Sequence, residues 1–276
     1  MGFNWSHRHR APQQVFVSAD NDEARNPHRF ILPFVSTHLK TKKSMREITT
    51  LTFLGFFIFN CSFGQNMDKA EANLDKKLVA ILDTIYIDDQ KNRNDQFFQR
   101  CQDIAKEYGR KSKELKDYVR IMVDQGSINL IKIEKILNEH GWLGADIVGV
   151  QGNYTLFLVI QHSDLETQEK YLPMMRGAVH KGNAKAQDLA FLEDRVALRK
   201  GERQIYGSQI GPDPETGEWV VRPLIDPDNV DKRRAEVGLG TLQDYISEHG
   251  MTWNVEEYKK QLPELEMRYR NYLKTK

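Results

Sequence analysis

A histidine with hydrogen-bonding neighbours follows the most apolar stretch of the chain. Gln161-His162-Ser163-Asp164 comes directly after the apolar run TLFLVI at 155–160. An imidazole in this position acts as a general base when a carboxylate orients it, and Gln161 is a candidate ligand-binding amide beside it. Asp164 is a poor orienting group, because residues two apart on a helix do not share a face. The alternative is a histidine at a helix C-terminus and an aspartate that caps the next helix.

A second group of charged residues, Glu193-Asp194-Arg195, lies in a predicted helix. Adjacent acids and bases in a helix usually form a solvated, salt-bridged face. Apolar residues on both sides of this group place part of the helix against the core, so we expect Asp194 or Arg195 to turn inward. An arginine held by a carboxylate binds phosphate or carboxylate groups well. The candidate catalytic set is therefore His162 as the base and Asp194 as its carboxylate partner, with Arg195 and either Gln204 or Gln209 to stabilise negative charge.

Neutral polar side chains are concentrated at 204–209, in a predicted strand. Alternation along a strand points Gln204, Tyr206 and Ser208 to one face and Gln209 to the other. Amides, a phenol and a hydroxyl suit a sugar or a peptide amide, and Gly207 would let a ligand approach the backbone closely. The alternative is a hairpin whose polar side meets water.

A further candidate pair, Asp89 and Arg93, lies just after the first predicted helix, where one turn separates Asp89 or Gln90 from Arg93. Taken alone, this motif is more typical of a surface ion pair than of a ligand site. Four side chains of metal-ligating type occur later in the chain: His162, Asp164, His180 and Asp194. Their spacing does not require a metal, so we predict no metal site, and the sequence identifies no cofactor. The chain has no GxSxG, HExxH, P-loop or GxGxxG signature.

These short motifs occur in a fixed order with several others. They are Asp89-Gln90-x-x-Arg93, Gly141-Trp142, Gln161-His162-x-Asp164, Asp194-Arg195, Gln204-x-Tyr206-Gly207-Ser208-Gln209, Pro223-Leu224-Ile225-Asp226-Pro227 and Arg233-Arg234-Ala235-x-Val237-Gly238-Leu239. In this order they resemble a bacterial domain-of-unknown-function family, the one numbered sixty-six twenty-four, over about residues 68–250. Ser208 stands where the family pattern has Thr, and Leu143 stands where it has Pro.

The resemblance implies no activity, because the function of that family is not established. It does imply that five of the candidate residues form one pocket: His162, Asp194, Arg195, Tyr206 and Gln209. We expect this pocket to bind a small polar ligand or a component of the cell envelope. The alternative is a hydrolase that uses the same residues, and the sequence does not decide whether the protein is an enzyme.

The elements that must position these residues are mostly helices. Apolar residues at helical spacing predict helices from Met67 to about residue 198 and again at 255–272, with a possible break at Gly126. Asn153 is expected to cap a central buried helix over 152–164, and Pro173 to kink or restart the helix after it. One β-hairpin is expected at 203–224, where a turn-forming GPDPETG separates two extended segments. The predicted fold is therefore mainly α, a compact multi-helix domain with one hairpin in its C-terminal third.

The first part of the chain reads as an export signal. Basic residues up to Arg46 precede an apolar run at 51–59 and small residues at Ser62 and Gly64, so residues 45–64 are predicted to be a signal peptide cleaved before Gln65. A lipoprotein anchored through Cys61 is the alternative. Residues 1–44 are polar and without periodicity, and we expect them to be a non-native or disordered extension ahead of a start at Met45.

Composition sets the remaining limits on class. The sequence of 276 residues is 39% hydrophobic and 29% charged, which is typical of one ordinary globular domain, predicted here at 65–276. A net charge of +1 argues against nucleic-acid binding, which needs a basic face. The mature chain has no apolar run of the length that spans a bilayer. We therefore expect a periplasmic or secreted helical protein.

Overall fold

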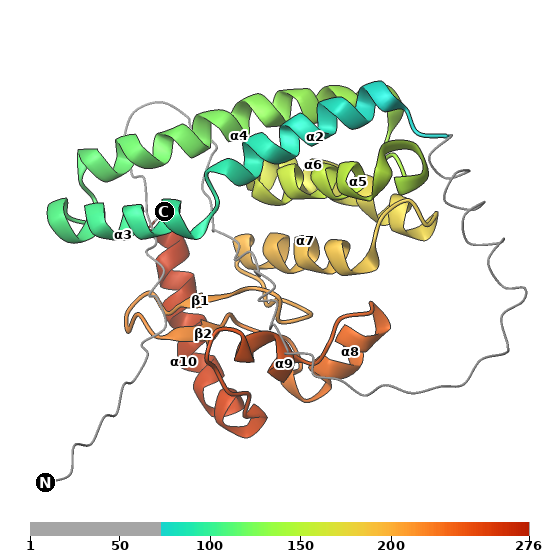
Figure 1. Ribbon diagram of the computed structural model, residues 1–276. Coiled ribbons are helices and arrows are strands. Elements are labelled where there is room, and N and C mark those ends of the chain that lie inside the picture. The colour runs from blue at the N-terminus through green and yellow to red at the C-terminus, as the bar shows by residue number, and fades with distance from the viewer. Residues whose placement is uncertain (1–72, 276) are drawn as a thin grey trace, which may run out of the picture.

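The computed structural model describes residues 73–275, and the predicted extension 1–44 and signal segment 45–64 lie outside them. The first part of the described chain is entirely helical. Its helices are α2 (Lys76–Lys91), α3 (Asp95–Tyr108), α4 (Lys113–His140), α5 (Ala145–His162), α6 (Leu165–His180) and α7 (Ala186–Arg199). They occupy the upper half of Figure 1, with α7 lowest among them. No helix within residues 73–275 is long and apolar enough to cross a membrane.

The C-terminal part is built around a short hairpin. Its elements are β1 (Ile210–Pro212), β2 (Trp219–Val221), the 3-10 turn η1 (Pro227–Asn229), α8 (Val230–Glu236), α9 (Leu242–Ser247) and α10 (Val255–Lys274). The two strands are antiparallel, with Ile210 opposite Val221 and Pro212 opposite Trp219. They pack with α9 and α10 around a small apolar core of their own. The prediction of a mainly helical fold with one hairpin is confirmed.

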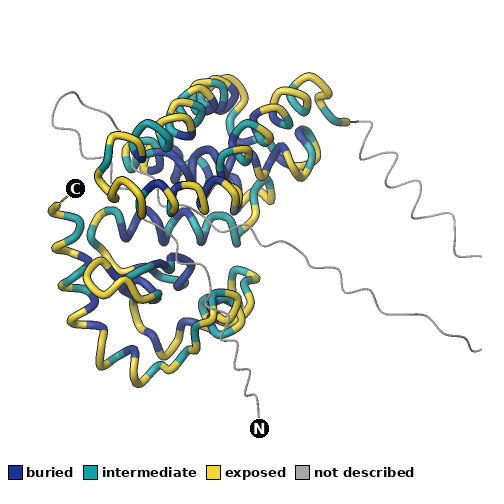
Figure 2. The backbone as a smooth tube through the Cα atoms, turned by 60° about the vertical axis from the view of Figure 1, so that its left-hand side comes forward, coloured by how far each residue is buried: buried dark blue, intermediate teal, exposed yellow. Residues whose placement is uncertain are grey.

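Helix α5 is the centre of the helical part. It packs against α2, α4, α6 and α7, and its residues 155–162 are all buried, as the dark blue segment between the outer helices in Figure 2 shows. A helix that is apolar on every side is stable only when other elements surround it. The apolar run at 155–160 was therefore correctly predicted to be a central buried helix.

Several helix ends follow their sequence signals. Gly109 and Gly141 end α3 and α4 with positive φ angles of 97° and 70°, a conformation that glycine adopts without a Cβ penalty. Thr241 caps α9 through its hydroxyl, which accepts a hydrogen bond from the backbone N–H of Asp244. These short-range signals need no tertiary contact to operate.

Two predicted interruptions and one predicted helix cap are wrong. α4 runs through Gly126, and α6 is continuous through Pro173. Asn153 does not cap α5, which begins at Ala145 and kinks at Gly149. The Asn153 amide instead donates hydrogen bonds of 2.7 Å to the carbonyls of Leu143 and Asn183, so it ties together the loops before α5 and after α6.

The hairpin is shorter than predicted. Of the segment 203–209, only Gln204 forms a bridge, with Leu224, and Gly207 has a φ of 69° that no strand accommodates. The side chains of residues 204–208 therefore do not alternate between the two faces of a strand. The predicted alternation is wrong because this segment is a loop, held by contacts made across the fold.

Candidate functional site

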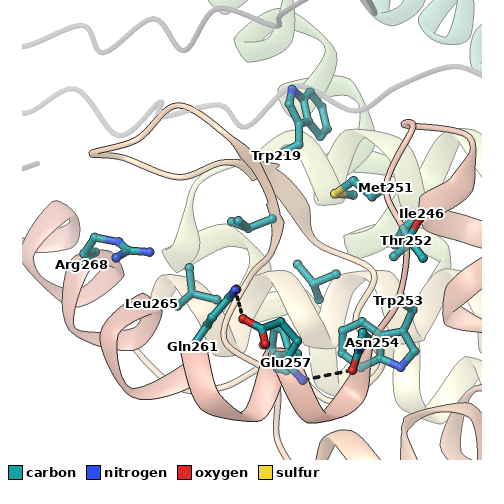
Figure 3. A pocket seen from close by; sticks show the side chains of 13 residues that line it. Trp219, Ile246, Met251, Thr252, Trp253, Asn254, Glu257, Gln261, Leu265 and Arg268 are labelled. Atoms are coloured by element: carbon teal, nitrogen blue, oxygen red, sulfur yellow. Dashed lines mark hydrogen bonds between the residues drawn. The ribbon is translucent and has the colours of Figure 1, made fainter.

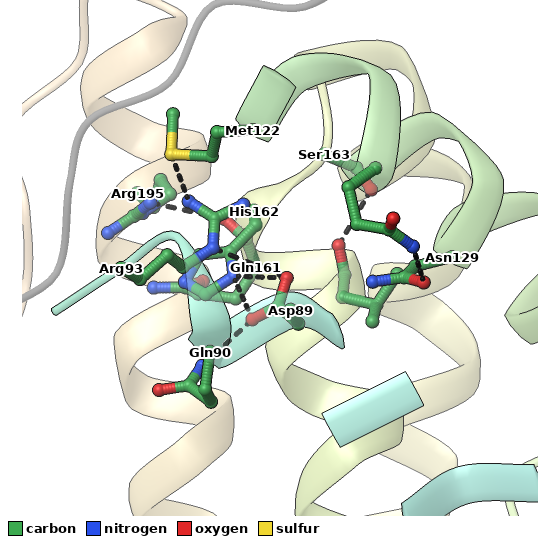
Figure 4. Close-up of polar contacts among 11 residues, drawn as sticks. Asp89, Gln90, Arg93, Met122, Asn129, Gln161, His162, Ser163 and Arg195 are labelled. Carbon is green, nitrogen blue, oxygen red and sulfur yellow. Dashed lines mark hydrogen bonds and ion pairs between the residues drawn. The ribbon is translucent and has the colours of Figure 1, made fainter. Parts of the chain in front are cut away.

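Asp89 and His162 form a buried hydrogen-bonded pair. Asp89 lies near the end of α2, and His162 is the last residue of α5. The two helices run in the same direction, since the Asp75 N–H at the start of α2 bonds to the Ile147 carbonyl near the start of α5. His162 Nδ1 lies 3.0 Å from Asp89 Oδ2 and 3.2 Å from Oδ1 (Figure 4). The packing of α2 on α5 thus brings together residues 73 positions apart in the chain.

The Asp89 carboxylate has further partners. Arg93 Nε donates to Oδ1 at 3.3 Å, and Gln90 Nε2 donates to Oδ2 at 2.8 Å. Burial alone would raise the pKa of Asp89, but the nearby His162 and Arg93 hold it well below its ordinary range. Arg93 itself is almost completely buried, and its Nη1 also reaches the Met122 sulfur at 3.5 Å. Asp89 is therefore a charged carboxylate that is compensated inside the protein.

His162 is neutral at neutral pH. Burial and the positive charge of Arg93 lower its pKa to about 4, against the opposing effect of Asp89. An ionised carboxylate only accepts hydrogen bonds, so the imidazole proton resides on Nδ1 and points at Asp89. Nε2 is then the acceptor nitrogen, and it is buried without a hydrogen-bond partner among the described residues. The arrangement leaves one basic nitrogen available for a proton.

Two arginines of α7 lie at the same end of α5. Arg195 Nη1 donates to the Gln161 carbonyl at 3.2 Å, and Arg199 Nη1 donates to the Ser163 carbonyl at 2.6 Å. Cations are stabilised there, because the last carbonyls of a helix carry partial negative charge. Burial lowers the pKa of Arg195 to about 9 and that of Arg199 to about 10, so both remain protonated at neutral pH. The charge of Arg195 also helps to lower the pKa of His162.

Asp194 is not the carboxylate partner of His162, so that prediction is wrong. Its Oδ1 accepts hydrogen bonds from the N–H groups of Ile205 and Tyr206 at 2.6 and 2.9 Å, and its Oδ2 accepts one from Ser208 N–H at 2.8 Å. Burial raises the pKa of Asp194, and these donors oppose that shift. The carboxylate thus holds the segment after α7 in a loop conformation, and the strand predicted there does not form.

The other polar side chains of this loop also bind the protein itself. The Gln204 amide donates to the carbonyls of Gln209 and Arg222 and accepts from the Gln209 N–H. Ser208 is buried, and its carbonyl accepts from the Tyr245 hydroxyl at 2.8 Å. Gln204 and Ser208 thus stabilise the loop and the hairpin from inside, and they are not the polar lining of a ligand site.

The two polar clusters meet at one backbone carbonyl. Gln161 Nε2 and Gln209 Nε2 lie 3.3 and 3.5 Å from the Phe191 oxygen. Tyr206 is half-buried and interacts with Glu193 on the outer side of α7. The five residues predicted to form one pocket therefore belong to two groups. His162 and Arg195 lie at the end of α5, whereas Asp194, Tyr206 and Gln209 lie at the loop after α7.

The residues assembled around the imidazole are Asp89, Arg93, Gln161, His162 and Arg195. The sequence offered Asp89 and Arg93 as candidate ligand-binding residues but favoured a surface ion pair. That preference is wrong, because both residues are buried, and the bond between Asp89 and His162 was missed. The only sequence signal for it was the first motif of the family-like series. Asp164 caps α6 by accepting from Thr167 N–H, the alternative that the sequence left open. Within residues 73–275, no three His, Cys, Asp or Glu side chains are grouped to hold a metal ion.

Comparison with known proteins identifies the family. The model of a family of unknown function (DUF6624) matches residues 99–255, more than half of the chain. The chain belongs to this family. The matched range contains His162, Asp194 and Arg195, whereas Asp89 and Arg93 precede it. No curated protein and no solved structure matches the chain.

The role of Asp194 in this family member predicts a large stability difference between neighbouring positions. Asp194→Asn removes the carboxylate that accepts hydrogen bonds from three backbone N–H groups, so we expect the free energy of unfolding to fall by about 2–4 kcal/mol. Glu193→Gln, one residue earlier, changes only the side-chain contacts with Arg176 and Tyr206, which are partly exposed, and should cost less than about 1 kcal/mol. Urea denaturation of both variants measures the difference, and equal losses would contradict the role of Asp194.

Proposed function

We propose that this protein is a hydrolase in which His162 is the general base and Asp89 holds its imidazole in position. The observation that carries the proposal is the 3.0 Å contact of Nδ1 with a charged carboxylate, combined with a buried Nε2 that lacks a partner among the described residues. Most buried polar atoms have a hydrogen-bond partner, so an unpartnered Nε2 beside a charged carboxylate supports a chemical role for this histidine. An oriented imidazole with a reserved acceptor nitrogen is the arrangement that base catalysis requires.

In the proposed reaction, a water molecule donates a hydrogen bond to Nε2 of His162. As the water oxygen bonds to the carbon or phosphorus of an ester-type substrate, its proton passes to Nε2 and the ring becomes an imidazolium. Asp89 stabilises that cation through Nδ1, as the carboxylate does in other histidine–carboxylate pairs. Nε2 then returns the proton to the leaving group as the bond to it breaks. The site ends the cycle in its starting protonation state.

Arg195 is proposed to stabilise the negative charge that develops on the substrate. It is a protonated guanidinium close enough to His162 to affect its pKa. Positive charge in a buried site has a large effect on a developing anion, because little water is present to screen it. The same charge makes His162 a weaker base, so acceleration in this site depends more on charge stabilisation than on base strength.

The alternative of a protein that only binds a ligand beside the hairpin is less well supported, because the side chains predicted to bind that ligand are already hydrogen-bonded within the protein. The Gln204 and Ser208 side chains, which predicted a polar recess, form hydrogen bonds within the protein. The Gln204 amide bonds to backbone groups, and the Ser208 hydroxyl accepts from the Gln209 amide. The acid–base pair, in contrast, retains an unused acceptor.

Substitution of the pair tests the proposal. With p-nitrophenyl acetate and bis(p-nitrophenyl) phosphate as probes, His162→Ala and Asp89→Asn should each lower the rate constant of hydrolysis by about 10²-fold or more. Asp88→Asn, one position earlier on α2, is the matched control and should retain full activity. Circular dichroism establishes that each variant folds. Hydrolysis that persists in folded His162→Ala would overturn the assignment.

The pH dependence gives a separate prediction. The neutral imidazole is the active form, and its pKa in the folded protein is about 4, below the ordinary 6.5. Activity should therefore be half-maximal near pH 4 and level from about pH 6 upward. An ordinary exposed histidine would instead give half-maximal activity near pH 6.5. A profile of that second kind, recorded while the protein remains folded, would contradict the proposed environment of His162.

We also propose that the chain is exported through residues 45–64. The charged, apolar and small segments occur there in the order of a signal peptide. Expression of the full coding sequence in a bacterium, followed by fractionation and N-terminal sequencing, should yield a periplasmic or secreted product that begins at Gln65. A product that begins with lipid-modified Cys61 would instead establish the lipoprotein alternative, and an uncleaved cytoplasmic product would refute export.

A further inference from the structure

A cavity lies in the C-terminal part, between β2, the loop 251–254 and α10. It has a volume of about 340 Å³, within the range of about 300–1,000 Å³ that small-molecule sites occupy. Its floor is formed by Val221, Ile246 and Leu265, which belong to the local apolar core. The polar pair described above is formed by other elements, so this cavity is independent of the proposed hydrolase site.

Two half-buried tryptophans line the cavity, and each indole packs against another aromatic ring of the protein. The Trp219 ring stacks on His249 with a centroid separation of 5.2 Å and an interplanar angle of 11°. The Trp253 ring packs on Tyr258 at 4.9 Å, and its backbone N–H donates to Gln243 Oε1 at 2.7 Å. Indoles held in this way lose little conformational entropy on binding a ligand, and their faces attract positively polarised C–H groups.

The polar groups of the cavity lie on the α10 side (Figure 3). Gln261 Nε2 donates to Glu257 Oε1 at 2.7 Å, and both side chains are otherwise exposed. The charges that line the cavity are Glu257 and Arg268, and Arg268 pairs with Asp213 at 3.0 Å. The lining therefore has no excess charge, but it offers amide and carboxylate groups one helical turn apart.

We propose that this cavity binds a neutral sugar ring. A pyranose has flat faces of C–H groups that match the two indoles, and its equatorial hydroxyls match the Gln261 amide and the Glu257 carboxylate. Its size fits the volume, and its neutrality fits the balanced lining. A phosphate or carboxylate ligand would be repelled by Glu257, and the cation of the lining, Arg268, already pairs with Asp213.

Calorimetric titration of the purified protein with N,N′-diacetylchitobiose and with cellobiose tests the proposal. At least one disaccharide should bind with a dissociation constant of roughly millimolar order. Trp219→Leu and Gln261→Leu should each weaken binding roughly tenfold or more. Gln261 is on the surface, so its variant tests the site even if Trp219→Leu fails to fold. Tyr108→Leu, an exposed aromatic on α3, is the matched control and should bind as the wild type does.

Three results would overturn the proposal. They are the absence of heat for both disaccharides, binding that Gln261→Leu leaves unchanged, and binding of tetramethylammonium in place of either sugar. The last result would define an aromatic cation site, and Glu257→Gln would abolish that binding. Hydrolysis by the Asp89–His162 pair is measured separately and does not depend on these outcomes.

Discussion

The hydrogen bond between Asp89 and His162 is the interaction on which the arrangement of this protein depends. A buried carboxylate is costly unless charge and hydrogen bonds compensate it, and here Arg93, Gln90 and the imidazole do so together. The bond joins the ends of α2 and α5, two helices that pack against each other along much of their length. Helix packing thus sets the geometry of the pair, and the pair in turn determines which imidazole nitrogen carries the proton.

The two buried carboxylates, Asp89 and Asp194, have different roles in the structure. Asp194 is surrounded by backbone N–H donors and shapes the loop that leads into the hairpin. Asp89 is surrounded by side chains and contacts a titratable ring. Both are buried to a similar extent, so the nature of their partners distinguishes them more than burial does. Arg195 follows Asp194 directly, but its side chain turns toward the end of α5, where it bonds to the Gln161 carbonyl. Adjacent residues of α7 therefore contact two different regions: Asp194 the loop and Arg195 the helix end beside the imidazole.

Local signals in the sequence predicted most helices, because apolar periodicity and terminal glycines act over a few residues. The same reasoning found His162 and Arg195 but paired the imidazole with the wrong aspartate. Asp89 lies 73 residues from His162, and only the packing of α2 on α5 brings them together. The loop at 204–209 was misjudged for a similar reason. Its alternating polar residues fit a strand locally, and the buried carboxylate of Asp194 on another element decides its conformation.

The tautomer and pKa of His162 test the account most directly. In ¹⁵N-labelled protein, the imidazole nitrogens report by NMR which of them carries the proton and at what pH the ring becomes charged. The account predicts a neutral ring with its proton on Nδ1 at pH 7, and protonation only near pH 4. Asp89→Asn should alter the tautomer population. A proton on Nε2, or a ring that is charged at pH 7, would contradict the central claim.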